Sequence, residues 1–221
     1  MQIRSDTELI KFQNRVLCVR TAAKQSARLL LLLHGWTGDE NSMWVFVRNF
    51  PMDYWIIAPR ASHVGEPGGY SWRASRAPQS GPGGWPCLED FRASADALIA
   101  LVDDYAAQNE IDAPQFDVIG FSQGAALTTT LTLLYPERVR RAGVLAGFLP
   151  MGSESWIEKH PLNGKPFFVA HGTRDEKVKI EYARQSVAML ERAGAQVTYC
   201  EDEIGHKLSA NSLRALEEFF A

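Results

Sequence analysis

The amino-acid sequence predicts an α/β fold in which a mostly parallel sheet of about seven strands is covered by helices on both faces. Along the 221-residue chain, short apolar runs rich in β-branched residues alternate with longer helical patterns. Such alternation is typical of a parallel sheet with helices packed against it. In addition, residues 29–33 are five consecutive leucines. That run is too short to span a bilayer and suits a central strand buried on both faces.

The individual elements follow this alternation from the N-terminus to the C-terminus. Strands are predicted near 16–20 and at 29–33, 54–58, 116–120, 142–146, 166–170 and 196–200. Helices are predicted near 40–49 and at 88–108, 123–135, 179–193 and 208–220, with a short helix in the loop before residue 166. The first strand could pair antiparallel at an edge of the sheet. No insertion is large enough to form a helical cap domain, so residues 1–221 are expected to form a single domain.

The pentapeptide Gly120-Phe121-Ser122-Gln123-Gly124 lies between a predicted strand and a predicted helix. A serine on such a sharp turn has its hydroxyl exposed at the edge of the sheet, and the glycines let strand and helix pass close together. This setting predicts that Ser122 is a nucleophile. The alternative is that Ser122 is only a small turn residue.

A serine hydroxyl is a weak nucleophile at neutral pH, so this hypothesis requires a base and a group that orients the base. Asp175 and His206 each follow the end of a predicted strand, and the order Ser, Asp, His is one in which such triads occur. The carboxyl ends of parallel strands meet at one edge, where Ser122, Asp175 and His206 can converge. Taken alone, Asp175 could instead be a helix N-cap, and His206 could be an exposed loop histidine.

A second motif, His34-Gly35-Trp36-Thr37-Gly38, follows the leucine run. Its glycines would let backbone N–H groups turn toward a cleft and stabilise the negative oxygen formed when an ester carbonyl is attacked. One oxyanion donor is expected to be the N–H of Gln123, and the other the N–H of Trp36. His34 is then expected to brace this loop, and His171 to be a packing or turn residue.

The chain resembles the phospholipase/carboxylesterase group of α/β-hydrolases, which includes small bacterial carboxylesterases and acyl-protein thioesterases. The matching segments extend from about residue 29 to the C-terminus: 33–38, 58–60, 70–72, 120–124, 171–175 and 205–206. The resemblance implies an α/β-hydrolase fold with Ser122 as nucleophile, His206 as base, Asp175 as orienting acid, and the backbone of Trp36 and Gln123 as oxyanion hole. Where the family often has Val-Pro after the acid and Phe-Asp after Ser-Trp, this chain has Val178-Lys179 and Arg73-Ala74, and both segments bear on substrate preference.

The stretch 61–86 is rich in glycine and proline and carries Tyr70, Trp72 and Trp85. Long loops in compact domains are usually functional or disordered. The three aromatic residues could form the apolar, substrate-binding wall of an acyl pocket. Two other interpretations stay open: the tryptophans could only pin the loop to the core, or the aromatics could line a homodimer contact.

Composition restricts the functional class. The formal net charge of −3 gives no reason to expect binding to nucleic acid or to an anionic membrane, and no run approaches the length of a membrane span. The N-terminus lacks the apolar core of a signal peptide, so a cytoplasmic location is expected. Cys18, Cys87 and Cys200 are too few and too widely spaced for a disulfide framework or a zinc site.

These observations predict a serine esterase that cleaves small-molecule carboxylic esters of short- to medium-chain acids through an acyl-enzyme, with no metal and no organic cofactor. A thioesterase or a lysophospholipase would use the same triad. A non-hydrolytic reaction on the same scaffold, such as perhydrolysis or a lyase step, is a further alternative. A protein of another class, which only binds a ligand on this fold, usually lacks a triad residue, whereas all three candidates are present here.

Overall fold

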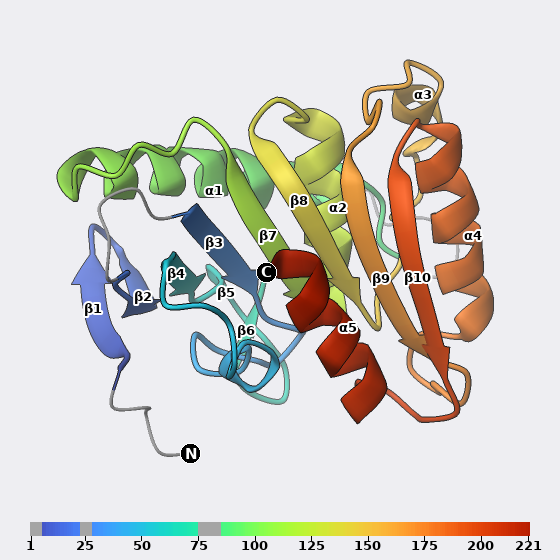
Figure 1. Cartoon of the computed structure of the whole chain (residues 1–221), viewed down its shortest axis with the longest axis horizontal. Coiled ribbons are helices and arrows are strands. Elements are labelled where there is room, and N and C mark those ends of the chain that lie inside the picture. Colours follow the sequence, from blue (N-terminus) through green and yellow to red (C-terminus); the bar gives the residue numbers. More distant parts are fainter. Residues whose placement is uncertain (1–5, 23–27, 75–84) are drawn as a thin grey trace.

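A computed structural model describes residues 6–22, 28–74 and 85–221, and it shows an eight-stranded sheet with helices on both faces (Figure 1). The strands are β1 (Glu8–Phe12), β2 (Arg15–Arg20), β3 (Arg28–Leu33), β4 (Tyr54–Pro59), β7 (Phe116–Phe121), β8 (Val139–Leu145), β9 (Pro166–Gly172) and β10 (Gln196–Asp202). Two short strands, β5 (His63–Val64) and β6 (Tyr70–Ser71), pair separately. The helices are the 3₁₀-helix η1 (Trp44–Phe46), α1 (Glu89–Gln108), α2 (Gln123–Leu134), α3 (Glu154–Ile157), α4 (Ile180–Arg192) and α5 (Ala210–Phe220).

The strand order in the sheet is β1-β2-β4-β3-β7-β8-β9-β10. The six strands from β4 to β10 are all parallel, while β2 pairs antiparallel with β4 and β1 pairs antiparallel with β2. The predicted α/β architecture is therefore confirmed. The strand predicted near 16–20 is β2, which is antiparallel as expected but does not form the edge, because β1 pairs with its outer side.

The leucine run of β3 divides its side chains between two cores. Leu29, Leu31 and Leu33 pack with residues of α1, α2 and α4, whereas Leu30 and Leu32 pack with η1 and α5 on the opposite face. In Figure 1, α5 lies in front of the sheet and α1 and α2 lie behind it. Because successive strand residues point to opposite faces, a strand covered on both sides needs an unbroken apolar sequence.

Two predicted elements differ from the structure. The strand β1 was not expected, because it is an edge strand in which only Phe12 is buried, and its sequence lacks the strict alternation of a half-buried strand. The helix predicted near 40–49 is reduced to η1. The side chains of Asp39 and Ser42 bind backbone amides of this segment, at 2.9 Å each, and such local bonds compete with helix formation.

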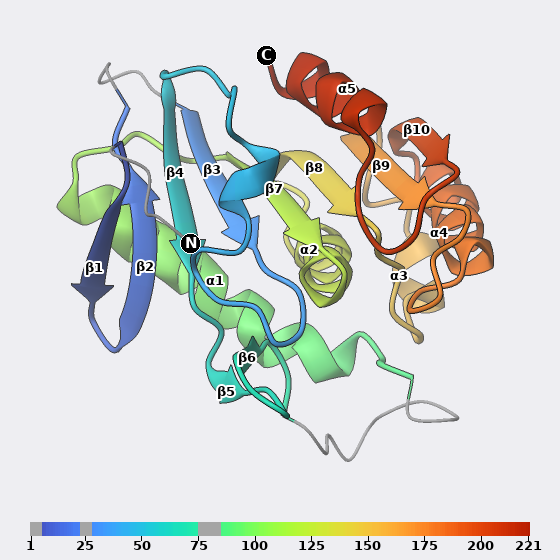
Figure 2. The same cartoon turned by 90° about the horizontal axis from the view of Figure 1, so that it is seen from below.

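All parallel strands end at the same edge of the sheet, and Figure 2 shows the loops gathered around it. This edge therefore carries the loop after β3, the turn after β7 and the segments after β9 and β10. The described residues contain no helical cap domain over it, and none of their helices is long and apolar enough to cross a membrane.

Candidate active site

Ser122 lies in a strained turn between β7 and α2, with φ 54° and ψ −114°. Its amide donates to the carbonyl of Leu145 at 2.9 Å, which ties the turn to the neighbouring strand. A Cβ at Gly120 would lie 2.1 Å from the carbonyl oxygen of Gly124, and a Cβ at Gly124 would lie 2.1 Å from the carbonyl oxygen of Leu33. Both glycines are therefore required by close backbone approach, as the pentapeptide indicates.

The structure brings Asp175 and His206 together. The Nδ1 atom of His206 lies 2.6 Å from Oδ2 of Asp175, and the other carboxylate oxygen accepts from the amides of Lys177 and Val178 at 2.9 and 3.0 Å. An ionised carboxylate can only accept, so the imidazole donates through Nδ1–H. This tautomer leaves a lone pair on Nε2, the atom that can take a proton.

The ring of His206 lies beside the turn that carries Ser122. Its centroid is 4.9 Å from that of Phe121, the residue that immediately precedes Ser122. Among the described residues, no hydrogen bond joins Ser122 to His206. Catalytic hydrogen bonds in enzymes without substrate are often long and tighten only when substrate binds. The arrangement therefore places an imidazole next to a partly exposed serine at the edge of the sheet.

The loop after β3 is held by hydrogen bonds that leave the amide of Trp36 unpaired among the described residues. Thr37 donates to the carbonyl of Tyr70 and Gly38 to that of Gly35, both at 3.0 Å. In the described part of the chain, the amides of Trp36 and Gln123 donate to no other protein atom. Both residues line the same cavity as Ser122, and unpaired N–H groups near a serine can stabilise an oxyanion.

His34 stabilises this loop through two hydrogen bonds of its imidazole ring. Its Nε2 accepts from the amide of Ala61 at 3.1 Å, so Nδ1 carries the hydrogen and donates to the carbonyl of Gly35 at 2.8 Å. Only 1% of its surface is exposed, and burial lowers the pKa of the imidazole below its usual value of 6.5. His34 is therefore a neutral structural residue.

His171 also contacts the acidic residue, which its sequence position alone does not reveal. Its Nε2 lies 2.7 Å from the carbonyl of Val178 and 3.3 Å from Oδ2 of Asp175. The side chain is fully buried, and burial lowers the pKa of its imidazole. A neutral His171 with hydrogen on Nε2 therefore supports both Asp175 and the turn that follows it.

The three aromatic residues expected to bind substrate lie in different places. Trp72 is a core residue: it is 1% exposed, and its indole N–H donates to the carbonyl of His34 at 2.8 Å. The side chain of Gln123 accepts from the Trp72 amide at 2.9 Å, which ties the segment to the turn that carries Ser122. Tyr70 faces Arg60, whose guanidinium lies 4.6 Å from the ring and is paired with Glu40. The structure therefore corrects the expectation that Trp72 and Tyr70 line the pocket.

Trp85 borders a cavity of about 610 Å³ that opens beside Ser122. The cavity is lined by Trp36, Glu66, Ser71, Arg73, Ala74, Trp85, Pro86, Ser122, Gln123, Phe148, Lys177 and Val178. Thus the described part of segment 61–86 serves two purposes, because Trp72 pins it to the core whereas Trp85 faces the cavity. Residues 75–84 of this segment lie outside the described part of the chain.

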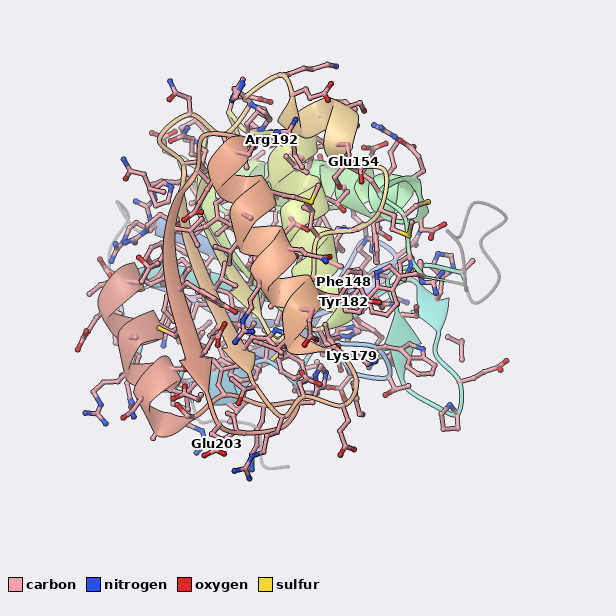
Figure 3. The ribbon with its side chains drawn as sticks, turned by 90° about the vertical axis from the view of Figure 1, so that its right-hand side faces the viewer. Phe148, Glu154, Lys179, Tyr182, Arg192 and Glu203 are labelled. Atoms are coloured by element: carbon pink, nitrogen blue, oxygen red, sulfur yellow. The ribbon has the colours of Figure 1, made fainter. Side chains whose placement is uncertain are left out.

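The aromatic wall of this cavity includes Phe148, which sequence reasoning missed, and the wall residue Trp85 also packs against Tyr182 outside the cavity lining. The ring of Trp85 lies 4.8 Å from that of Phe148 and stacks at 4.5 Å on that of Tyr182, in the first turn of α4. Figure 3 shows Phe148 and Tyr182 close together at this end of the helix. Phe148 follows the end of β8, so its place at the carboxyl edge of a parallel strand is the signal that could have identified it.

Across residues 6–22, 28–74 and 85–221, no group of three His, Cys, Asp or Glu side chains is arranged to hold a metal ion. The described site thus consists of a serine, a histidine-carboxylate pair, two unpaired amides and a largely apolar cavity.

A family model described as phospholipase/carboxylesterase matches residues 14–221. The chain is 32% identical over 123 residues to carboxylesterase SOBER1 of Arabidopsis thaliana, covering 54% of this chain and 53% of that protein. It is 26% identical over 190 residues to acyl-protein thioesterase 1 of Kluyveromyces lactis, covering 79% and 81% of the two chains. The chain spans about half the length of the first curated relatives that it matches.

Solved structures show the same fold. The carboxylesterase of Bacillus cereus superimposes with a TM-score of 0.81 at 22% identity and covers 94% of each chain. The predicted α/β-hydrolase fold is therefore confirmed.

Proposed function

This chain belongs to the phospholipase/carboxylesterase family, and on that premise we propose that it is a serine hydrolase that cleaves carboxylic esters of short- to medium-chain acids. The observation that carries the proposal is the 2.6 Å contact between His206 Nδ1 and Asp175 Oδ2, next to a serine in a strained strand-to-helix turn. A histidine oriented in this way has Nε2 available for a proton from Ser122.

In the first step, His206 removes the proton of Ser122 while the serine oxygen attacks the ester carbonyl. The amides of Trp36 and Gln123 stabilise the oxyanion, and removing one such donor typically costs roughly 3–4 kcal/mol. The tetrahedral intermediate then collapses: the bond to the leaving oxygen breaks, and His206 gives its proton to that oxygen. The products of this step are an alcohol and an acyl-enzyme.

In the second step, His206 removes a proton from water, which attacks the acyl-enzyme. The bond between the acyl carbon and the serine oxygen then breaks, and His206 gives the proton to that oxygen, so the acid is released and Ser122 is regenerated. Throughout, Asp175 keeps the imidazole in one tautomer and stabilises its charged form. The two backbone hydrogen bonds to Asp175 hold the carboxylate in the required orientation.

The 610 Å³ cavity beside Ser122 fits the acyl part of such a substrate. Trp85, Phe148 and Val178 supply apolar surface, as expected of a small-molecule pocket. Arg73, Lys177 and Glu66 bring charges of both signs to the same cavity, and Arg73 is paired with Asp90 at 3.6 Å. A cavity with this much apolar surface favours substrates whose acyl chains are longer than acetyl.

A second candidate is a thioesterase, which is favoured by the match to acyl-protein thioesterase 1 over 79% of this chain. It would use the same residues with sulfur as the leaving atom. Steady-state rates with an ester and a thioester of the same acid would separate the two candidates.

The decisive measurement is the rate of p-nitrophenyl butyrate hydrolysis by the wild type and by Ser122→Ala. The variant should lose activity by a factor on the order of 10⁵ because no other hydroxyl replaces the nucleophile. Ser62→Ala, at an exposed serine, is the matched control and should keep the wild-type rate. A fluorophosphonate probe should label the wild type and not Ser122→Ala; absence of labelling in the wild type would instead favour a protein that only binds a ligand.

A further inference from the structure

Trp36 borders a second cavity as well as the large one. This smaller cavity has a volume of about 230 Å³, and its side-chain walls are mainly Trp36, Met43, Phe46 and Phe121. Among the described residues, Trp36 alone lines both cavities. Trp36, which is 57% exposed, thus lies between two pockets of unequal size.

The smaller cavity lies on the histidine side of the site. Its wall residue Phe121 packs against the ring of His206 with 4.9 Å between centroids, and Phe46 stacks on Phe121 at 5.4 Å. The large cavity is lined by Ser122 and Gln123 and not by Phe121. The large cavity therefore adjoins Ser122 directly, whereas the small cavity adjoins Phe121, which is next to Ser122 in the sequence and next to the ring of His206 in space.

The reaction assigns a different part of the substrate to each cavity. In the tetrahedral intermediate the former carbonyl carbon is bonded to Ser122 Oγ, and its oxyanion faces the amides of Trp36 and Gln123. The departing oxygen must receive a proton from His206, so the leaving group has to lie within hydrogen-bond reach of that ring. The acyl group is then directed away from His206, toward the large cavity.

We propose that the 230 Å³ cavity is the leaving-group site and that it restricts the substrates to esters of small apolar alcohols. This assignment rests on the proposed esterase function. Trp36 then has two functions: its amide contributes to the oxyanion hole, and its side chain separates the acyl pocket from the alcohol pocket. Phe46 and Phe121 determine how large an alcohol is accepted.

The test compares two isomeric esters, ethyl hexanoate and hexyl acetate, by the initial rate of acid release. The wild type should have a kcat/KM at least about tenfold higher for ethyl hexanoate, because even one misplaced methylene changes such rates about tenfold or more. Phe46→Ala enlarges the small cavity and should raise the relative rate for hexyl acetate about tenfold. Trp85→Ala, which alters the large cavity, should change the dependence on acyl length and leave the dependence on alcohol length unchanged.

Val45→Ala is the matched control, because Val45 is a neighbour of Phe46 in η1 that lines neither cavity. It should keep the wild-type ratio of the two rates. Phe46→Trp is a second variant with the opposite expected effect. Its larger ring fills the small cavity and should lower the rate for hexyl acetate below that of the wild type.

The proposal is overturned if Phe46→Ala or Phe46→Trp changes the dependence on acyl length and leaves the alcohol dependence as in the wild type. A wild-type preference for hexyl acetate would also overturn it. Ester cleavage that persists in Ser122→Ala would instead contradict the proposed function itself.

Discussion

Two fully buried carboxylates lie near opposite ends of the parallel strands, and their hydrogen-bond partners differ. Asp117, near the start of β7, accepts hydrogen bonds from Arg140 at 2.6 Å, Arg141 at 3.2 Å and the hydroxyl of Tyr54 at 2.8 Å. Asp175, after β9, has no arginine or lysine partner among the described residues and contacts two backbone amides and the rings of His171 and His206.

The different partners determine what each carboxylate can do. The charge of Asp117 is already neutralised by two guanidinium groups, and the bond to Asp117 raises the pKa of Arg140. Burial and the nearby Asp117 raise the pKa of Tyr54. The charge of Asp175 remains available to stabilise an imidazolium on His206. We therefore expect changes at Asp117 to affect folding and changes at Asp175 to affect the reaction.

The largest expected effect follows Asp175→Asn. An amide at this position favours the wrong tautomer of His206 and cannot stabilise its charged form, so kcat should fall about 10⁴-fold. The asparagine oxygen can still accept from the amides of Lys177 and Val178, so the melting temperature should stay close to that of the wild type. Rates of p-nitrophenyl butyrate hydrolysis and a thermal melt test both statements, and a variant retaining a tenth of the activity would contradict the role of Asp175.

The reverse pattern is expected for Asp117→Asn. Loss of the charge leaves two arginines without their buried ionic partner. The free energy of unfolding should therefore fall by about 2–4 kcal/mol. The expected loss is at the lower end for a buried pair because Arg140 is partly exposed and solvent screens its charge. Urea titration measures this change. The kcat of the remaining folded enzyme should equal that of the wild type; a large loss of kcat at unchanged stability would contradict the comparison.

His171→Phe tests the residue that supports Asp175. The variant removes the hydrogen bond to the Val178 carbonyl and the contact with Asp175, so both stability and kcat/KM should fall, the latter about tenfold. His160→Phe, at an exposed histidine outside both cavities, serves as the control and should leave kcat/KM unchanged. If only stability changes in His171→Phe, the residue does not position Asp175.

The smallest effect concerns pH. Burial lowers the pKa of His34 and His171 below their usual 6.5, so the unfolded chain binds these protons more readily than the folded chain. The stability from these groups is therefore complete above about pH 6.5 and declines as the pH falls below it. The free energy of unfolding should therefore decrease as the pH is lowered from 7 to 5. Urea titrations across this range should show a shallower slope for His171→Phe than for the wild type.

Local sequence patterns were sufficient to predict the parts of the site that depend on backbone geometry. The spacing of Gly120 and Gly124 around Ser122 indicated a turn in which a Cβ has no room, and the structure shows those close approaches. The order of Ser122, Asp175 and His206 at strand ends predicted that they meet at one edge, since parallel strands share their carboxyl end. Asp175 and His206 are in direct contact in the structure.

The cavity wall could not be predicted in the same way. Trp72 and Trp85 occupy similar glycine- and proline-rich surroundings in the sequence, yet one is buried against His34 and the other faces the cavity. Phe148 and Tyr182 come from different elements and meet only through Trp85. Likewise, β1 forms because β2 offers an edge to pair with, and its own sequence gives little indication of a strand.

By itself, the sequence determined the α/β architecture, the strained serine turn and the order of the candidate triad, because periodicity and glycine spacing act within a few residues of the chain. Only the tertiary structure decided which aromatic residues line the cavities, which buried carboxylate is neutralised by arginines, and how Trp36 divides the space beside Ser122. These features depend on contacts between segments far apart in the chain, where packing against a partner, and not local preference, sets the position of a side chain.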